Sequence, residues 1–292
     1  MIPPLSGKLS DQDDPHIELE EVIRKIHDLP SLPQVEQALL NKLNDDNLSL
    51  EQIVEKVALD PSLAAKVLKL ANTSYYGANS RVVTIQQAVA MLGTSHLKSL
   101  IRTSIFNKCM PSDACRNFDA KAFWRHNIAT AICAELISRT LHMKHDFAFT
   151  AGLLHDIGRL ALASCFPEEY SQAIRCCHQK DCGMLEAERV ILGIDHVAAG
   201  QILAIEWQFS EAIQDAIRGH HEPSADDLNS LASVIHVANA IVHALDLCDE
   251  KTECMPPVSD EAWNSLALSE TQLHTIFHET ELRFAAMNQI IQ

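Results

Sequence analysis

The amino-acid sequence predicts an all-α protein, and three features of its 292 residues support that prediction. Apolar residues recur with the 3.6-residue period of amphipathic helices through most of the chain. Glycine is scarce, with nine residues, and β-branched runs are few. Side chains that favour helix starts stand before several of the periodic segments. We expect a two-lobed helical bundle without a substantial sheet.

After a flexible tail at residues 1–16, residues 17–110 are predicted to form an N-terminal helical lobe. A short helix over 17–29 leads into LPSLP, a turn bracketed by prolines that opens a second helix near Gln34. Gly93 is expected to close a later helix, because glycine adopts the left-handed backbone of a helix C-cap. Capping boxes or an aspartate–proline pair mark three helix starts: Ser49 with Gln52, Asp60 with Pro61, and Thr84 with Gln87.

The segment NKCMPSDACRN, residues 107–117, interrupts the helical period and is expected to join the two lobes. Residues 111–292 are predicted to form the second lobe together with C-terminal helices. A proline-containing loop, CDEKTECMPPVSD, precedes two terminal helices. The other helices expected in this lobe span residues 119–141, 147–164, 168–179, 184–192, 196–207, 211–221 and 228–246.

Composition narrows the class of protein. Hydrophobic residues make up 47% and charged residues 21%, as in ordinary globular proteins. The formal charge of −16 repels phosphate backbones, so general nucleic-acid binding is not expected. No run approaches the roughly 20 apolar residues of a membrane span, and the first residues lack a secretory signal, so no membrane insertion is expected. Nine cysteines without a C-x-x-C pair favour thiols in a reducing cytoplasm.

Histidine is the residue type most suggestive of chemistry, with fifteen in the chain. Several lie near apolar helix faces or at helix ends, and one precedes an aspartate in GLLHDIGRLALAS, residues 152–164. Neutral imidazole and carboxylate are common ligands of Zn, Fe and Mn ions. The candidate metal ligands from this pattern are His126, His155, Asp156, His196, His220 and His221.

A structural role for each histidine stays open, because a lone histidine near an apolar face is usually a hydrogen-bonded core residue. Neighbouring residues on a helix point about 100° apart, so His220 and His221 converge only at a helix end. Gly219 before the pair and Pro223 after it supply such an end. The order of the candidates over five helices favours one shared site.

These motifs resemble known families. The order H…HD…H…HH resembles the HD superfamily of metal-dependent phosphohydrolases, and HDIGR and HHE resemble blocks of its HD-GYP branch. The segments LPSLP, VALDPSLAAKVLKLANTSYYG and TIQQAVAMLGTSHLKSLI are similar to the opening of the HD-related output domain, HDOD. With the HD-like part, the resemblance extends to about residue 245. It implies that His126, His155 and Asp156 hold one ion, while the three later histidines hold another and Asp156 bridges the two.

Two departures from the superfamily weaken the expectation of enzyme activity. Asn239 in IHVANAI stands where the superfamily has its last aspartate, and an amide is a weaker, uncharged ligand. The residues after HHE run PSADDLNS, without the GYP substrate motif, and this departure argues against hydrolysis of cyclic-di-GMP. Arg159 replaces the usual lysine after HDIG and is a candidate phosphate-binding residue, although its other interpretation is a surface charge.

The resemblance implies a bacterial signal-transduction output module that acts on signalling proteins in trans. A metal-dependent phosphohydrolase acting on a nucleotide or cyclic dinucleotide is the second interpretation. The expected cofactors are divalent ions, namely Fe, Mn, Zn or Mg. Because Asp156 is the only carboxylate among the predicted ligands, occupancy is expected to be partial, or one ion to bind more tightly than the other.

Overall fold

The computed structural model describes residues 17–29, 54, 57, 61–76, 82–109, 115–143, 148–180, 182–224, 230–248 and 256–291. Every regular element in these ranges is a helix, which confirms the all-α prediction. The predicted tail and the predicted helix starts at Gln34, Ser49 and Asp60 lie outside them. None of the helices in these ranges is both long and apolar enough to cross a membrane.

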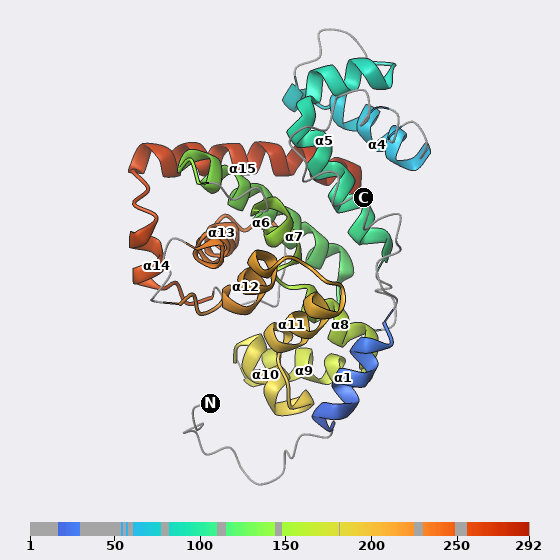
Figure 1. Ribbon diagram of the computed structural model, residues 1–292, viewed down its shortest axis with the longest axis vertical. Coiled ribbons are helices and arrows are strands. Elements are labelled where there is room, and N and C mark those ends of the chain that lie inside the picture. The colour runs from blue at the N-terminus through green and yellow to red at the C-terminus, as the bar shows by residue number, and fades with distance from the viewer. Residues whose placement is uncertain are drawn as a thin grey trace.

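The centre of the molecule is helix α6, Ala120–Thr140, which buries most of its side chains. It packs against α7, Ala148–Leu154, and α13, Leu231–Ala244, while α15, Glu270–Ile291, lies across it (Figure 1). Helix α14, Asp260–Ser265, packs against α13. Asp119 caps α6 by accepting hydrogen bonds from two backbone N–H groups of its first turn. Because most side chains of α6 are buried against neighbouring helices, this central layer can hold polar side chains at defined positions.

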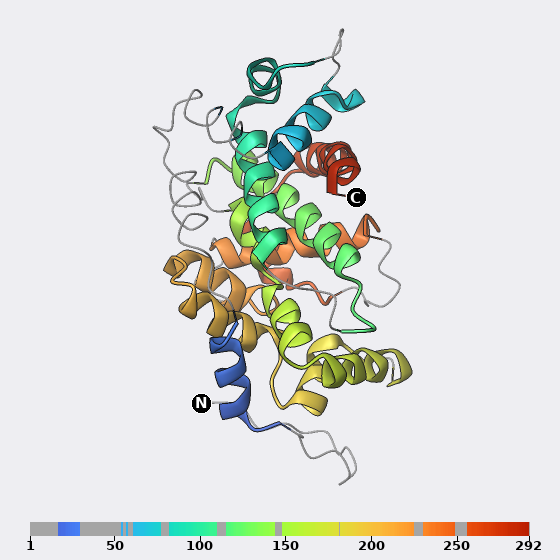
Figure 2. The ribbon, with the colours of Figure 1, turned by 90° about the vertical axis from the view of Figure 1, so that its right-hand side faces the viewer.

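One end of the molecule consists of α4, Pro61–Ala71, the short 3₁₀ helix η1, Ser74–Tyr76, and α5, Ile85–Cys109 (Figures 1 and 2). The hydroxyl of Tyr75 donates to Glu279 of α15 at 3.0 Å, which ties this end to the C-terminal helix. The predicted capping box is present, since the Gln87 N–H donates to Thr84 Oγ1 at 3.2 Å. Gly93, with φ of 74°, divides α5 as expected.

The opposite end gathers five helices in sequence: α8, Ile157–Cys165, α9, Pro167–Lys180, α10, Met184–Leu192, α11, His196–Glu206, and α12, Glu211–Gly219 (Figure 2). Helix α1, Leu19–His27, packs here, against α8 and α11. The first helix of the predicted N-terminal lobe thus contacts helices assigned to the second lobe. The division of the chain at about residue 110 stays a prediction.

Two predicted helices end earlier than expected, and both breaks fall at candidate ligands. The single helix predicted over 147–164 is wrong: α7 and α8 are separated by His155 and Asp156. The His155 ring donates from Nδ1 to the carbonyl of Gly152 at 2.8 Å, so a side chain occupies an acceptor at the helix end. Helix α12 ends at Gly219 rather than at residue 221. The breaks free these side chains to turn inward.

Candidate metal centre

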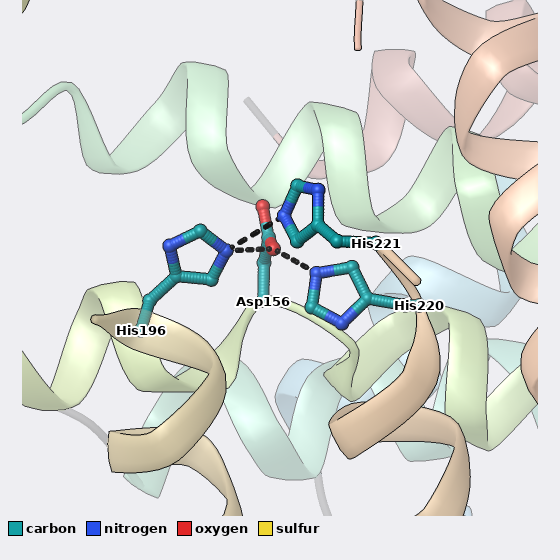
Figure 3. Close-up of side chains that lie close together, drawn as sticks. All are labelled: Asp156, His196, His220 and His221. Atoms are coloured by element: carbon teal, nitrogen blue, oxygen red, sulfur yellow. Dashed lines mark hydrogen bonds and ion pairs between the residues drawn. The ribbon is translucent and has the colours of Figure 1, made fainter. Parts of the chain in front are cut away.

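Six of the predicted ligands come together between the central helices and the end formed by α8 to α12, and we call them the His–Asp cluster. One comes from the middle of α6, two from the turn between α7 and α8, one from the first position of α11, and two from the turn after α12. Figure 3 shows three of the histidines gathered around the carboxylate of Asp156. The members are His126, His155, Asp156, His196, His220 and His221.

Asp156 with three histidines forms the first of two groups in the cluster. Asp156 Oδ1 lies 3.4 Å from His196 Nε2 and 3.2 Å from His220 Nε2 (Figure 3). His196 Nε2 lies 3.0 Å from His221 Nε2. One ligand atom from each of the four residues lies within 4.8 Å of every other, so a single ion could contact all four.

The second group shares Asp156 and adds His126 and His155. The Nε2 atoms of these two histidines are 3.4 Å apart, and His155 Nε2 lies 3.7 Å from Asp156 Oδ1. The three ligand atoms of this group also lie within 4.8 Å of one another. The two groups are those that the sequence resemblance implies, with Asp156 common to both.

Hydrogen bonds on the outer side of the rings determine which nitrogen faces the cluster. His155 donates from Nδ1 to Gly152 O, and His220 donates from Nδ1 to Ile217 O at 2.7 Å. His196 donates from Nδ1 to the Glu188 carboxylate at 2.6 Å. In the neutral ring the other nitrogen, Nε2, is then a lone-pair acceptor. Acceptor nitrogens therefore face one another and the Asp156 oxygen, an arrangement that a cation between them would stabilise.

Burial keeps most of these rings neutral, whereas the Glu188 carboxylate raises the pKa of His196 against the effect of burial. Burial lowers the pKa of His155 to about 4 and holds the pKa of His126 well below its usual value. The pKa of His221 is also lowered, by burial and by the neighbouring rings. Burial would by itself raise the pKa of Asp156, but the surrounding imidazoles hold it well below the usual range. Neutral imidazole and ionised carboxylate are the forms in which these residues bind metal.

The sequence did not predict a chain of buried, hydrogen-bonded polar groups next to the cluster. Glu188, which is fully buried, accepts from the backbone N–H and the ring of His196 and from the Tyr170 hydroxyl. Arg159 Nε donates to the Tyr170 hydroxyl at 3.3 Å, and Arg159 NH1 lies 3.4 Å from Asp156 Oδ2. The contacts thus run from His196 through Glu188, Tyr170 and Arg159 back to Asp156. The sequence signal was only that Glu188 stands eight residues before the candidate ligand His196, and helix periodicity does not show that these two side chains meet.

The expectation that Arg159 is a surface charge is wrong, because only 4% of it is exposed. The guanidinium lies beside a cluster carboxylate and stabilises its ionised form. Its role as a phosphate ligand stays a prediction. Two buried carboxylates, Asp156 and Glu188, therefore accompany one buried guanidinium, whereas the sequence count considered Asp156 alone.

Close backbone approaches fix the spacing of the cluster. A Cβ atom at Gly158 would lie 1.9 Å from the carbonyl oxygen of His196, so only glycine allows α8 and α11 to approach this closely. A Cβ atom at Gly152 would lie 2.7 Å from Ala131 Cα, at the contact between α7 and α6. These two glycines therefore bring His196 near Asp156 and His155 near His126.

The seventh predicted ligand, Asn239, lies on α13. Its side chain is buried, and its Oδ1 accepts no hydrogen bond from the described residues. On the same helix, His236 donates to the carbonyl of His220 at 2.8 Å, and the ring of His243 lies 4.8 Å from that of His126. Residues at spacings of three and four share one helix face, so Asn239 faces the region between His220 and His126.

The buried Glu188 provides a first test of this arrangement. Glu188→Gln is expected to weaken ion binding at the His196 group by about 10–100-fold. A neutral amide polarises the imidazole less than a carboxylate does, so Nε2 of His196 becomes a weaker metal ligand. Calorimetric titration of chelator-treated protein with Zn²⁺ measures the change. Glu186→Gln, an exposed change on the same helix, is the control. Equal affinities in the two variants would contradict the assigned role of Glu188.

Comparisons with known proteins agree with the fold. The HDOD domain family model matches residues 29–223. An uncharacterised protein of Treponema pallidum is 24% identical over 226 residues, which cover 76% of this chain and 44% of that protein. The chain therefore spans less than half the length of this relative.

Two solved structures extend the comparison. A provisionally assigned phosphohydrolase from Shewanella amazonensis SB2B has a TM-score of 0.70 and 26% identity, over 93% of this chain and 98% of that one. A provisionally assigned signal transduction protein from Marinobacter aquaeolei VT8 has a TM-score of 0.74 and 22% identity, over 94% of this chain and 64% of that one. The second likeness establishes the fold alone.

Proposed function

The chain belongs to the HDOD family, and from this premise we propose that it is a signal-transduction output module with a divalent metal centre at the His–Asp cluster. In this proposal the module acts on signalling proteins in trans, and the ion stabilises or adjusts the shape that those proteins recognise. The name of the Marinobacter structure supports a place in signalling. The observation that supports the metal is the cluster geometry.

That observation is the set of acceptor atoms that face one another. Two histidine Nε2 atoms lie 3.2 and 3.4 Å from the same Asp156 oxygen while their Nδ1 atoms are committed as donors elsewhere. Lone pairs directed at one another in a buried site are unfavourable without a proton or a cation. Burial disfavours protons on His155 and His221. Although the Glu188 carboxylate raises the pKa of His196 against the effect of burial, one proton on that ring leaves the other lone pairs facing one another, so a metal ion satisfies the cluster better.

The donor set favours certain ions. Imidazole nitrogen suits Zn, Fe and Mn better than Mg, which prefers oxygen ligands. We expect the ion at Asp156, His196, His220 and His221 to bind more tightly, because the Glu188 carboxylate accepts a hydrogen bond from the His196 ring and makes that ring a stronger ligand. At the group of His126, His155 and Asp156, the uncharged amide of Asn239 adds no negative charge to attract the second ion.

A metal-dependent phosphohydrolase acting on a nucleotide or cyclic dinucleotide is the second candidate function. The name of the Shewanella structure and the presence of two ligand groups around a shared carboxylate favour it. Bound ions would supply Lewis-acid stabilisation of a phosphoryl oxygen. The chain's own residues would hold those ions, with Asp156 shared between the groups and Arg159 keeping that carboxylate ionised.

Elemental analysis of freshly purified protein, followed by assays with bis(p-nitrophenyl) phosphate and cyclic-di-GMP, tests both candidates. A stoichiometric divalent ion without turnover supports the output module. Turnover that disappears on chelation and returns with Mn²⁺ or Fe²⁺ would favour the phosphohydrolase. Absence of any ion, even after incubation with Mn²⁺, Fe²⁺ and Zn²⁺, would contradict the metal centre.

Asn239→Asp tests the contribution of α13 to the weaker group. The added carboxylate is expected to tighten the weaker ion on the order of tenfold, since ligand charge strongly affects ion affinity. Phosphatase activity, if present, should rise from a very low level. Calorimetry with Zn²⁺ measures the affinity, and Asn264→Asp on α14 is a control outside the cluster. Two ions that bind the unmodified protein with equal affinity would refute the expected asymmetry.

A further inference from the structure

His243 is a half-buried histidine that no motif identified, and it lies beside the cluster. Its ring centroid is 4.8 Å from that of His126, with 45° between the ring planes. Five pairs of rings within the His–Asp cluster have centroid separations from 4.2 to 5.7 Å and interplanar angles from 37° to 85°. His243 is therefore placed relative to His126 as the candidate ligands are placed relative to one another.

The position of His243 on α13 relates it to Asn239. The two residues are four apart, so their side chains lie on the same face of the helix, one turn from each other. At one end of this face His236 contacts the backbone of His220, and at the other end His243 contacts the ring of His126. The face therefore covers the cluster from one group to the other.

The residues that follow α13 contact α6 at Arg125 and at its neighbour His126. Arg125 donates from its guanidinium to the carbonyl of Leu247 at 3.1 Å. The buried thiol of Cys248 lies 4.0 Å from Nδ1 of His126, on the opposite side of that ring from the Nε2 that faces His155. These two contacts hold the C-terminal end of α13, and with it His243, next to His126.

We propose that His243 is an additional protein ligand for the ion held by His126, His155 and Asp156. It supplements Asn239 on the same face of α13, whose amide is a weak metal ligand. This inference rests on the proposed metal centre and extends it by one residue. With His243 the group offers three imidazoles and one carboxylate. That donor set is typical of Zn²⁺ and other first-row transition ions and unsuited to Mg²⁺. His243 is not among the residues whose ligand atoms lie within 4.8 Å of one another in this group, so the proposal requires its ring to turn toward the ion when the ion binds.

Calorimetric titration of chelator-treated protein with Zn²⁺ tests the proposal, with metal content after dialysis as a second readout. His243→Ala should weaken the lower-affinity ion by at least about 100-fold, because loss of a direct ligand exceeds the 10–100-fold effect of losing an outer partner. The higher-affinity ion should change far less. His243→Gln, which preserves side-chain volume on α13, should give a loss of the same order.

Two comparisons make the outcome decisive. His274→Ala, an exposed histidine on α15, should bind both ions as the unmodified protein does. The visible absorption of the Co²⁺-loaded protein should change in His243→Ala and not in His274→Ala, since it reports the ligands directly. If the unmodified protein binds two ions and His243→Ala retains both affinities and the same spectrum, the proposal for His243 is wrong while the metal centre stands. If the unmodified protein binds no ion, both are wrong.

Discussion

Asp156→Ala is expected to bind neither ion, because this carboxylate belongs to both ligand groups and is the only anionic group among the ligands. The fold should persist, since the neighbouring Leu154, Ile157 and Leu160 are fully buried and hold α7 and α8 in place. Elemental analysis gives the metal content. Zn²⁺ at a free concentration of 100 times its dissociation constant stabilises a binding-competent protein by about 2.7 kcal/mol. The Tm of the unmodified protein should therefore rise with Zn²⁺, and that of Asp156→Ala should not.

Asp156→Asn separates charge from shape. The amide has nearly the same volume, and its N–H groups would donate to the lone pairs of His196 and His220. This variant should fold as well as the unmodified protein and still bind no ion. Asp260→Ala, at an exposed aspartate on α14, is the matched control. Retention of either ion at full stoichiometry by Asp156→Asn would show that the histidines alone form the site.

Gly158→Ala is expected to disrupt both stability and metal binding, although glycine to alanine is the smallest change that can be made there. The new Cβ would lie 1.9 Å from His196 O and 2.6 Å from Gly200 N, both backbone atoms of α11. No side-chain rotation relieves such contacts, so α8 and α11 must separate. Overpacking typically costs about 1–3 kcal/mol, which corresponds to a Tm lower by roughly 2–12 °C. His196, at the start of α11, would move away from Asp156.

Gly183→Ala is the control for this substitution. A Cβ at Gly183 meets no atom within 4 Å, and its φ of −67° suits alanine. Thermal unfolding of chelator-treated samples isolates the packing effect, and Zn²⁺ titration then measures the loss of the His196 group. A Gly158→Ala variant with unchanged Tm and unchanged Zn²⁺ affinity would exclude the close helix contact as the feature that places His196.

The sequence by itself determined the helices and most of their starts, because those signals are local. Asp195 stands directly before the helix predicted to begin at residue 196, and its side chain accepts from the Ala198 N–H at 2.9 Å, as expected of a helix cap. Gly93 was expected to end a helix, and its backbone is left-handed. The identity of the candidate ligands also came from the sequence, through their order and its resemblance to a family.

Only the tertiary structure decided how those residues meet. The break at His155 and Asp156 escaped prediction because the apolar period continues through it, while a side-chain bond to Gly152 O ends α7. Arg159 had the alternative interpretation of a surface charge and Glu188 was not singled out at all, yet both are buried and hydrogen-bonded to residues of other helices. His243 became a candidate only when α13 was found against α6. Helix periodicity and helix caps depend on residues within one or two helical turns, so the sequence pattern contains them. Burial and ligand geometry depend on contacts between helices far apart in sequence, so only the tertiary structure shows them.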